Sequence, residues 1–521
     1  MRVASAVRTQ RPTLPWAEVA CKSRTLAAVP SRRVLLWSLA AFAVLGVLAA
    51  VRVADWSYGA DTGTFVQVVL GALGPMQNGV ERTTHYRFHW SPTLVLLWPL
   101  LAATHSVWVL QAILALATVA CAPLLAAIAT LRDRAAPLGG LADRIAAVAL
   151  VYPPLVAVGF GEFRDLGLLP PLALGWWLAL ERRAWGWVAL CAVLLAGLRE
   201  DVCLELVLLG VALGALALRH ADRARAAAAF GSAAAAAASA AVYVLVIVPR
   251  VGPWPPSHFY DYPFAHGPLA LLAAPFSHPA AFLAAIATFG RLTYVLEALV
   301  PLAFLPLRSR LAWLSVPGFA IVLLANSGLV WRMGEHYAAL WIPWLLIAFA
   351  AGIASLRLPR RWTTISFGLS AVVLVAFSPL HPWHYLQPSY HALGDARAAL
   401  ACVPPDASVA THDEWYTAVS AQRPRAMVLG ADPPPADWLV VADDYPNRSF
   451  ASTVLPRVHA LAASGAYRAV CRFGAVTAYE RSEPRQGPGI HTRVQVQHVS
   501  DRLFRNGSAG FGLRSQAAGA R

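Results

Sequence analysis

The fold class is decided by residues 184–218, AWGWVALCAVLLAGLREDVCLELVLLGVALGALAL. This run is almost wholly apolar, but it is interrupted by Arg199-Glu200-Asp201. A helix that crosses a membrane needs about 20 apolar residues, so the run is too long for one crossing. Charged side chains in hydrocarbon are costly. We therefore predict two short spanning helices that meet at one face of a membrane, with the three charged residues in water between them.

The composition of the whole chain points to the same class. The 521 residues are 58% hydrophobic and only 13% charged, whereas soluble domains carry roughly 25% charged residues. The net charge of +15 comes from arginines clustered between apolar runs, which is typical of cytoplasmic loops. We therefore predict a polytopic α-helical membrane protein whose partner is the lipid bilayer and not a nucleic acid.

Apolar runs of suitable length predict about eleven transmembrane helices. They are 34–53, 107–130, 142–160, 166–181, 185–198, 202–218, 226–248, 284–307, 311–328, 337–355 and 362–379. The runs Thr93–Ala103 and Leu269–Pro275 are too short to cross and are predicted to lie at the interface. When the spans are counted alternately, all the arginine clusters fall on one side, which we assign to the cytoplasm. These clusters are 1–33, 132–144, 182–183, 219–225, 308–310 and 357–361.

The chain divides into four parts. Residues 1–33 form an Arg-rich cytoplasmic segment, and residues 34–380 form the transmembrane domain with an extracytoplasmic loop at 54–106. Residues 381–481 alternate helix-like and strand-like stretches and predict a small extracytoplasmic α/β domain. Its predicted helices are 391–402 and 449–464, and its predicted strands are 408–411, 426–429, 438–441, 467–473 and 476–479. Residues 482–521 lack apolar periodicity and are predicted to be disordered.

Cysteines carry little functional information. Cys121, Cys191 and Cys203 lie in predicted spans and are expected to pack as small apolar residues. Cys402 and Cys471 both lie in the exported domain, where a disulfide can form, and the sequence leaves their pairing open. No CxxC or Cys/His spacing indicates zinc, and no resident cofactor is predicted.

Five charged patches fall on the extracytoplasmic side and predict a site there. They are residues 55–89, 162–165, 199–201, the loop around Asp261, and 332–336. The guanidinium groups of Arg199, Arg332 and Arg164 offer a planar fork of donors that suits a phosphate. Neighbouring acids would orient them, and His336 would assist. The other predicted substrate-binding residues are Glu162, Asp165, Glu200, Asp201, Glu335, His85 and His89.

Each patch also has a structural interpretation that the sequence leaves open. The mixed-sign triplets at 162–165 and 199–201 could be salt-bridged helix caps. Asp61 could cap the next helix, because Asp is a favoured N-cap residue. His85 and His89 have an i,i+4 spacing that can bind a metal, but Pro92 follows closely and no acid stands at a ligand-like spacing, so interfacial hydrogen bonding is the commoner use.

Several motifs in order resemble the bacterial membrane proteins grouped as domain of unknown function 2079. They are Asp61-Thr-Gly-Thr-Phe65-Val-Gln67, His85-Tyr-Arg-Phe-His89-Trp-Ser91-Pro92, Glu162-Phe163-Arg164, Arg199-Glu200-Asp201-Val202, and His336-Tyr337 with Pro343. The resemblance covers residues from about 55 to 480. Val66 stands where the family usually has a second acid, and Arg164 where it tends to have His. A metal held by paired carboxylates therefore has little support.

The layout of that family is similar to the GT-C glycosyltransferase fold, whose members take sugars from polyprenyl-phosphate donors. The resemblance implies an inverting transferase in the bacterial plasma membrane, with Asp61 as the catalytic base and an acceptor outside the cytoplasm. Two other interpretations remain open. One is a non-catalytic scaffold or assembly protein of the cell envelope, and the other is a lipid or solute transporter. A transporter should place buried polar groups near the bilayer midplane, whereas here the charges lie at helix ends.

Overall fold

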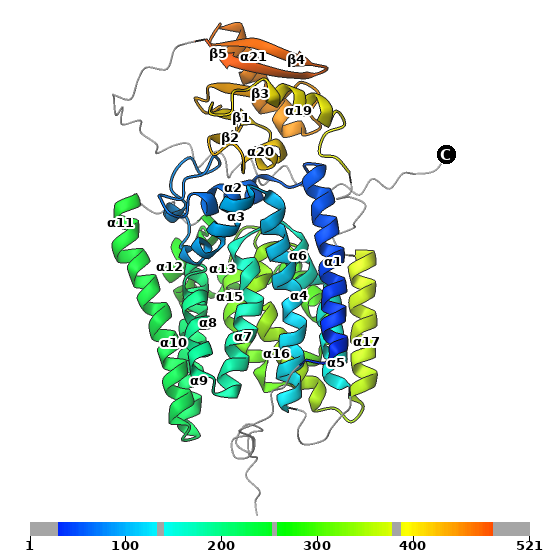
Figure 1. Ribbon diagram of the computed structural model, residues 1–521. Helices are drawn as coiled ribbons and strands as arrows, with labels where there is room; N and C mark the ends of the chain where they lie inside the picture. Colours follow the sequence, from blue (N-terminus) through cyan, green and yellow to red (C-terminus); the bar gives the residue numbers. More distant parts are fainter. Residues whose placement is uncertain (1–29, 133–139, 253–257, 378–386, 483–521) are drawn as a thin grey trace, which may run out of the picture.

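The structure is a computed structural model that describes residues 30–132, 140–252, 258–377 and 387–482. A helical bundle forms most of it, and a small α/β unit, residues 387–482, lies against one end (Figure 1). Nearly all of the predicted disordered tail at 482–521 and of the predicted cytoplasmic segment at 1–33 lies outside the described residues.

Within the described ranges, four helices are long and apolar enough to cross a membrane. They are α1 (Arg32–Ala54), α4 (Val107–Arg132), α9 (Glu200–Arg219) and α10 (Arg223–Val242), the last of which continues to Val251. Two bent pairs raise this number to six: α5 (Leu141–Val151) with α6 (Pro153–Phe160) at 52°, and α12 (Gly267–Ser277) with α13 (Pro279–Ile286) at 115°. The bundle is therefore membrane-type, and the figure of eleven crossings stays a prediction.

The remaining bundle helices are shorter. They are α2 (Ala60–Leu70), α3 (Trp98–Thr104), α7 (Leu169–Arg182), α8 (Trp185–Ala196), α14 (Phe289–Leu299), α15 (Val316–Leu323), α16 (Ile342–Ala354) and α17 (Pro359–Val372). The run Thr93–Ala103 is helical as predicted, formed by the 3-10 turn Pro92–Leu97 followed by α3.

One predicted span is wrong. Residues 284–307 do not form one helix, because α13 ends at Ile286 and α14 starts at Phe289. Thr288 forms the break, since its side chain accepts a hydrogen bond from the backbone N–H of Arg291 and so caps α14. After α14, Ala303 and Phe304 adopt positive φ angles, which end the helical path again.

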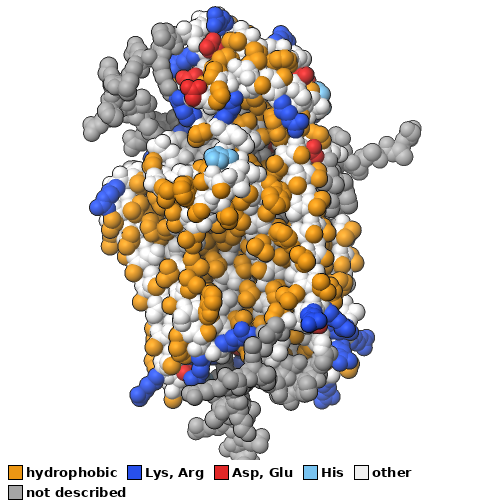
Figure 2. All heavy atoms as spheres, viewed as in Figure 1, with side chains coloured by type: hydrophobic (Ala, Val, Ile, Leu, Met, Phe, Trp, Pro, Cys, Tyr) orange, Lys and Arg blue, Asp and Glu red, His pale blue; other side chains and the backbone are white. Residues whose placement is uncertain are grey.

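The core and the outer wall of the bundle differ as expected for a membrane protein. Helix α16 is buried along almost its whole length and packs against α4 and α7. Apolar side chains such as Leu36, Leu190 and Leu245 are exposed on the outer helices. Figure 2 shows this apolar wall, with Arg side chains at the bundle end away from the α/β unit and further Arg side chains, mixed with acidic ones, on the α/β unit.

The α/β unit is built on one five-stranded sheet in the order β2-β1-β3-β5-β4. Strand β1 (Val409–Thr411) runs parallel to β2 (Ala426–Val428) and β3 (Trp438–Ala442), while β5 (Val476–Arg481) is antiparallel to β3 and β4 (Tyr467–Phe473). All five predicted strands are present. The predicted helices appear as α19 (Leu393–Ala401) and α21 (Leu455–Ala463), the latter preceded by a π-helical turn, whereas α20 (Asp413–Val419) was not predicted.

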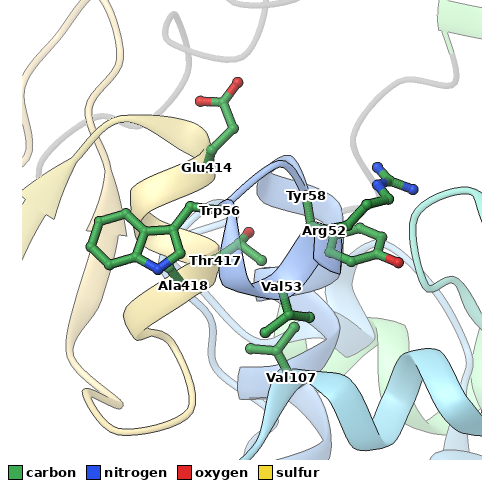
Figure 3. A pocket seen from close by; sticks show the side chains of 8 residues that line it. All are labelled: Arg52, Val53, Trp56, Tyr58, Val107, Glu414, Thr417 and Ala418. Atoms are coloured by element: carbon green, nitrogen blue, oxygen red, sulfur yellow. The ribbon is translucent and has the colours of Figure 1, made fainter. Parts of the chain in front are cut away.

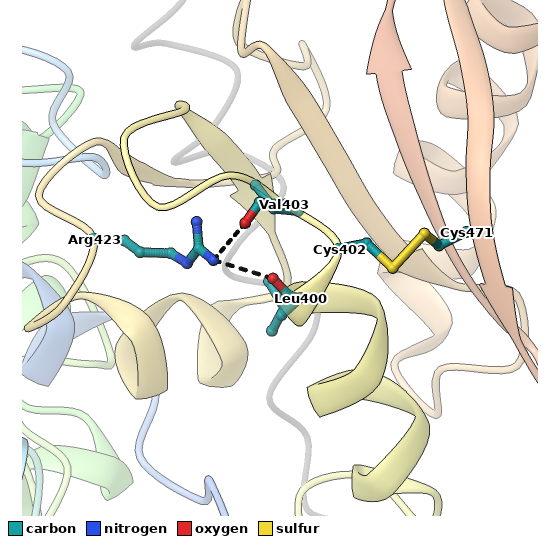
Figure 4. Close-up of a disulfide and its surroundings, with 5 residues drawn as sticks. All are labelled: Leu400, Cys402, Val403, Arg423 and Cys471. Atoms are coloured by element: carbon teal, nitrogen blue, oxygen red, sulfur yellow. Dashed lines mark hydrogen bonds between the residues drawn. A yellow bond between two sulfur atoms is a disulfide. The ribbon is translucent and has the colours of Figure 1, made fainter.

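Cys402 and Cys471 form a disulfide between the end of α19 and strand β4 (Figure 4). Arg423 reinforces the same corner, since its guanidinium donates to the carbonyls of Leu400 and Val403 at 3.1 and 2.8 Å. The three cysteines at 121, 191 and 203 are buried in the bundle, as predicted.

Removing the disulfide should destabilise the protein measurably. The bond joins residues 69 apart in sequence, and a loop of this length is expected to contribute about 2–4 kcal/mol, mainly by restricting the unfolded chain. We expect the double substitution Cys402→Ser/Cys471→Ser to lower the unfolding midpoint followed by tryptophan fluorescence. Reductant should shift the wild type to the same midpoint and leave the variant unchanged. A wild type that does not respond to reductant would contradict this expectation.

Candidate functional site

Helix α2 begins at a cap supplied from another part of the chain. Its N-cap residue, Gly59, has no capping side chain. Instead, the carboxylate of Glu162, from the turn between α6 and α7, accepts hydrogen bonds from the N–H of Gly59 at 2.8 Å and from the N–H and hydroxyl of Thr62 at 3.1 and 2.6 Å. A carboxylate here satisfies free N–H groups and faces the positive end of the helix dipole.

Asp61 lies in the first turn of this helix and forms an ion pair with Arg164. The prediction that Asp61 could be the N-cap residue is wrong, because Gly59 holds that position. The Asp61 side chain is 43% exposed and that of Arg164 is 22% exposed. The Arg164 Nε atom is buried and has no hydrogen-bond partner within the described part of the chain. Arg164 thus lies between the water-accessible carboxylate of Asp61 and a more buried region.

That buried region is centred on Arg199, which precedes α9 and is 6% exposed. Its Nη2 lies 2.9 Å from an Asp201 oxygen, and its Nη1 lies 3.9 Å from Asp165. Asp165 in turn accepts a hydrogen bond of 2.6 Å from the Ser91 hydroxyl. A guanidinium with two acids around it can stay charged although it is buried.

His336 completes the cluster around Arg199. Its Nε2 accepts a hydrogen bond of 3.3 Å from Arg199 Nη1, while its Nδ1 lies 4.0 Å from Glu335. Burial first, and then the charges of Arg164, Arg199 and His89, lower the pKa of His336 well below its usual range. The imidazole is therefore neutral near pH 7, and it acts as an acceptor for the guanidinium.

Glu335 and Arg332 lie at the exposed edge of this cluster. Burial raises the pKa of Glu335, and the nearby charges of Arg164 and Arg332 offset part of the increase. Arg332 itself is exposed. The guanidinium groups that stabilise the charge of Glu335 therefore come from two different segments of the chain.

The two histidines of the first loop pair with acids. His89 Nδ1 lies 2.9 Å from Glu200, and the other oxygen of Glu200 accepts the N–H of Trp90 at 2.9 Å. His85 Nδ1 lies 3.0 Å from Glu81 and is almost fully buried. Within the described residues, no group of three or more His, Cys, Asp or Glu side chains is arranged to hold a metal.

The His89–Glu200 pair predicts a pH-dependent stability. Burial lowers the pKa of His89, but the Glu200 carboxylate outweighs it, so the pKa is raised above its ordinary value of 6.5. A raised histidine pKa stabilises the fold below the unfolded pKa, and this contribution is lost as pH rises through the folded pKa. We expect His89→Gln to lower the unfolding temperature more at about pH 6 than at about pH 9.

The matched control for this prediction is His220→Gln, since His220 is exposed at the end of α9. Its effect on the unfolding temperature should be small and equal at both pH values. If the decrease in unfolding temperature caused by His89→Gln became larger as the pH rises, the folded protein would be holding the imidazole neutral.

Four of the five predicted patches come together through these contacts. The loop at 258–266 contributes Tyr260 rather than Asp261. Burial and then the charge of Asp201 raise the pKa of Tyr260, and the charge of Arg199 offsets part of the increase. Asp261 instead caps its own loop by accepting from the N–H of Gly267. No sequence pattern predicted Ser91, Glu81 or Tyr260 as site residues. Ser91 lies within the quoted motif, but its role in the cluster is visible from its hydrogen bond to Asp165, which is 74 residues away in sequence.

A small pocket lies at the junction of α1, α4 and α20 (Figure 3). Its cavity volume is about 10 Å³, far below the 300–1,000 Å³ usual for small-molecule sites. In Figure 3 the Glu414 side chain points away from the other lining residues. The pocket is therefore no candidate for a lipid-linked substrate. It is lined by Arg52, Val53, Trp56, Tyr58, Val107, Glu414, Thr417 and Ala418.

The fold is similar to a known membrane protein of GT-C architecture. The crystal structure of ArnT from Cupriavidus metallidurans, bound to undecaprenyl phosphate, superposes with a TM-score of 0.55 at 12% identity. The match covers 87% of this chain and 99% of ArnT. The chain is therefore a mostly helical protein with a GT-C-like fold and a small C-terminal sheet.

The sequence places the chain in one family. It belongs to the predicted membrane proteins described as DUF2079, whose model matches residues 61–470. This confirms the family predicted from the motifs. A comparison with curated proteins gives no match.

Proposed function

We propose that this protein transfers a sugar from a polyprenyl-phosphate donor to an acceptor outside the cytoplasm. The observation that carries the proposal is the ion pair of Asp61 with Arg164, because it brings an acid of the first loop beside the cluster around Arg199. The likeness in fold to ArnT, which was crystallised with undecaprenyl phosphate, supports a lipid phosphate as the ligand.

Arg199 and Arg164 hold the donor phosphate in this proposal. Each has a buried Nε without a hydrogen-bond partner in the described part of the chain, and each guanidinium matches the geometry of phosphate oxygens. Asp165 and Asp201 orient Arg199 from two sides. His336 keeps Arg199 in place as a neutral acceptor, and Arg332 supplies positive charge at the exposed edge.

Asp61 is the general base of the proposed reaction. It takes the proton of the acceptor hydroxyl as the hydroxyl oxygen bonds to the anomeric carbon, and the bond from that carbon to the phosphate oxygen breaks. The leaving polyprenyl phosphate carries the electron pair and is stabilised by the guanidinium groups. Without donor, Arg164 pairs with Asp61, and donor phosphate would draw Arg164 away so that the carboxylate is free to act.

The proposed orientation places the site and the α/β unit on the extracytoplasmic face of a bacterial plasma membrane. Basic side chains at the other end of the bundle support it (Figure 2), because Lys and Arg are enriched in cytoplasmic loops. The Cys402–Cys471 disulfide supports it too, since such bonds persist in oxidising compartments.

The direct test uses isolated membranes that contain the protein together with their own acceptors, to which labelled polyprenyl-phosphate sugars are added. Release of free polyprenyl phosphate, dependent on the protein, is the expected result. Movement of intact donor between the leaflets without cleavage would instead support a transporter. Binding with neither cleavage nor movement for any donor would overturn the proposal in favour of a scaffold.

A further inference from the structure

Helix α2 is held on its outer side by the α/β unit (Figure 1). The Thr417 hydroxyl, on α20, donates to the carbonyl of Gly59 at 2.6 Å and accepts from the N–H of Gly63 at 3.1 Å. Gly59 and Gly63 each lie two residues from Asp61. Since Glu162 binds the N–H of Gly59 from the bundle, the first turn of α2 is fixed from both sides.

A second contact lies further along α2, at the buried amide of Gln67. Its Oε1 accepts from the Tyr416 hydroxyl at 2.9 Å and from the N–H of Gly79 at 2.7 Å. Its Nε2 donates to the carbonyl of Ala426 at 3.0 Å. One side chain therefore links α2, the first loop, α20 and strand β2.

The two surfaces approach so closely that only glycine fits between them. A Cβ atom at Gly63 would lie 2.6 Å from Thr417 Oγ1 and from a Tyr416 ring carbon, and 2.9 Å from the Thr417 Cα. A Cβ at Gly79 would lie 2.1 Å from the carbonyl oxygen of Ala426. Backbone atoms are involved at both points, so neither contact can be relieved by a side-chain rotation.

We infer that the α/β unit is a working part of the site, and that Thr417 and Gln67 are positioning residues that set where the Asp61 carboxylate stands. This inference rests on the proposed function, because it assigns Asp61 a task that depends on placement. The hydrogen bonds of Thr417 act on Asp61 through the backbone of α2. Small displacements of a reacting group are expected to lower the rate of the chemical step more than the binding of donor.

The test compares Thr417→Val with Thr417→Ser in the full-length protein. Valine keeps the shape but removes both hydrogen bonds, whereas serine retains the hydroxyl. We expect Thr417→Val to lower kcat for polyprenyl phosphate release by roughly 10- to 100-fold with little change in donor KM, and Thr417→Ser to restore most of it. Hydrogen exchange at the Gly63 amide should be faster in Thr417→Val.

Thr453→Val is the matched control, because Thr453 is exposed and, among the described residues, its hydroxyl bonds to the carbonyl of Ser449 in its own helical turn. It should leave both kcat and exchange unchanged. An active wild type with equal kcat in Thr417→Val would overturn the positioning role alone. A wild type that releases no polyprenyl phosphate would overturn the proposed function and this inference with it.

Discussion

Replacing Asp61 by Asn should lower the release of polyprenyl phosphate from labelled donors by roughly 10²- to 10⁴-fold, the usual contribution of a general base. Asparagine keeps the size of the side chain but cannot take a proton from the acceptor. The fold should persist, because the Asp61 side chain is 43% exposed and an exposed ion pair contributes at most about 1 kcal/mol. The unfolding temperature should therefore stay close to that of the wild type, and donor should bind at least as tightly, because Arg164 is no longer paired with Asp61.

Asp55→Asn is the control for this comparison. Asp55 ends α1 in the same loop and is partly exposed like Asp61, but it lies outside the proposed site. Its substitution should leave turnover unchanged. If Asp61→Asn and wild type turn over equally, Asp61 is not the base, and the role of the first loop would have to be reassigned.

Arg199→Leu should destabilise the protein by about 3–5 kcal/mol, since removing one partner of a buried ion pair leaves uncompensated charge. Asp165 is 1% exposed and Asp201 lies 2.9 Å from Arg199, so both acids would lose their nearest guanidinium. His336 would lose its donor as well. Chemical unfolding in detergent micelles measures the effect.

Two further variants separate charge from shape. Arg199→Lys keeps the charge and should recover part of the stability, but it should still weaken donor binding, because lysine cannot form the planar fork. Arg183→Leu removes an ion pair with Asp222 in which Arg183 is about half exposed, and it should cost less than about 1 kcal/mol. Equal losses for Arg199→Leu and Arg183→Leu would show that the Arg199 cluster contributes little to stability.

The membrane character and the α/β unit were predictable from local patterns. Strands β1 to β5 stood out because short apolar runs alternate with Pro and Gly, and the charges at 199–201 marked the start of α9 at Glu200. Counting the predicted membrane crossings placed the charges at 199–201 on the same side as the patches at 162–165 and 332–336. Motif order was enough to predict the family, which the comparison confirms.

Features that depend on distant contacts were not predictable. Glu162 has no capping signal in its own neighbourhood, since the N–H groups it binds lie 100 and 103 residues away. Helix α20 is only seven residues long, and it is fixed by its contacts with α2 rather than by its own periodicity. The pairing of Cys402 with Cys471 could not be predicted, because their separation in sequence says nothing about their distance in space.

The contact between Gly63 and Thr417 also sets an order of events during synthesis, since the two residues are 354 positions apart. A ribosome adding about 5–20 residues per second needs roughly tens of seconds to make the intervening chain. Throughout that interval the first loop has emerged without the partner that fixes α2. A nascent chain interrupted before residue 417 would therefore carry the aspartate and every arginine of the cluster, yet lack the piece that finishes the assembly.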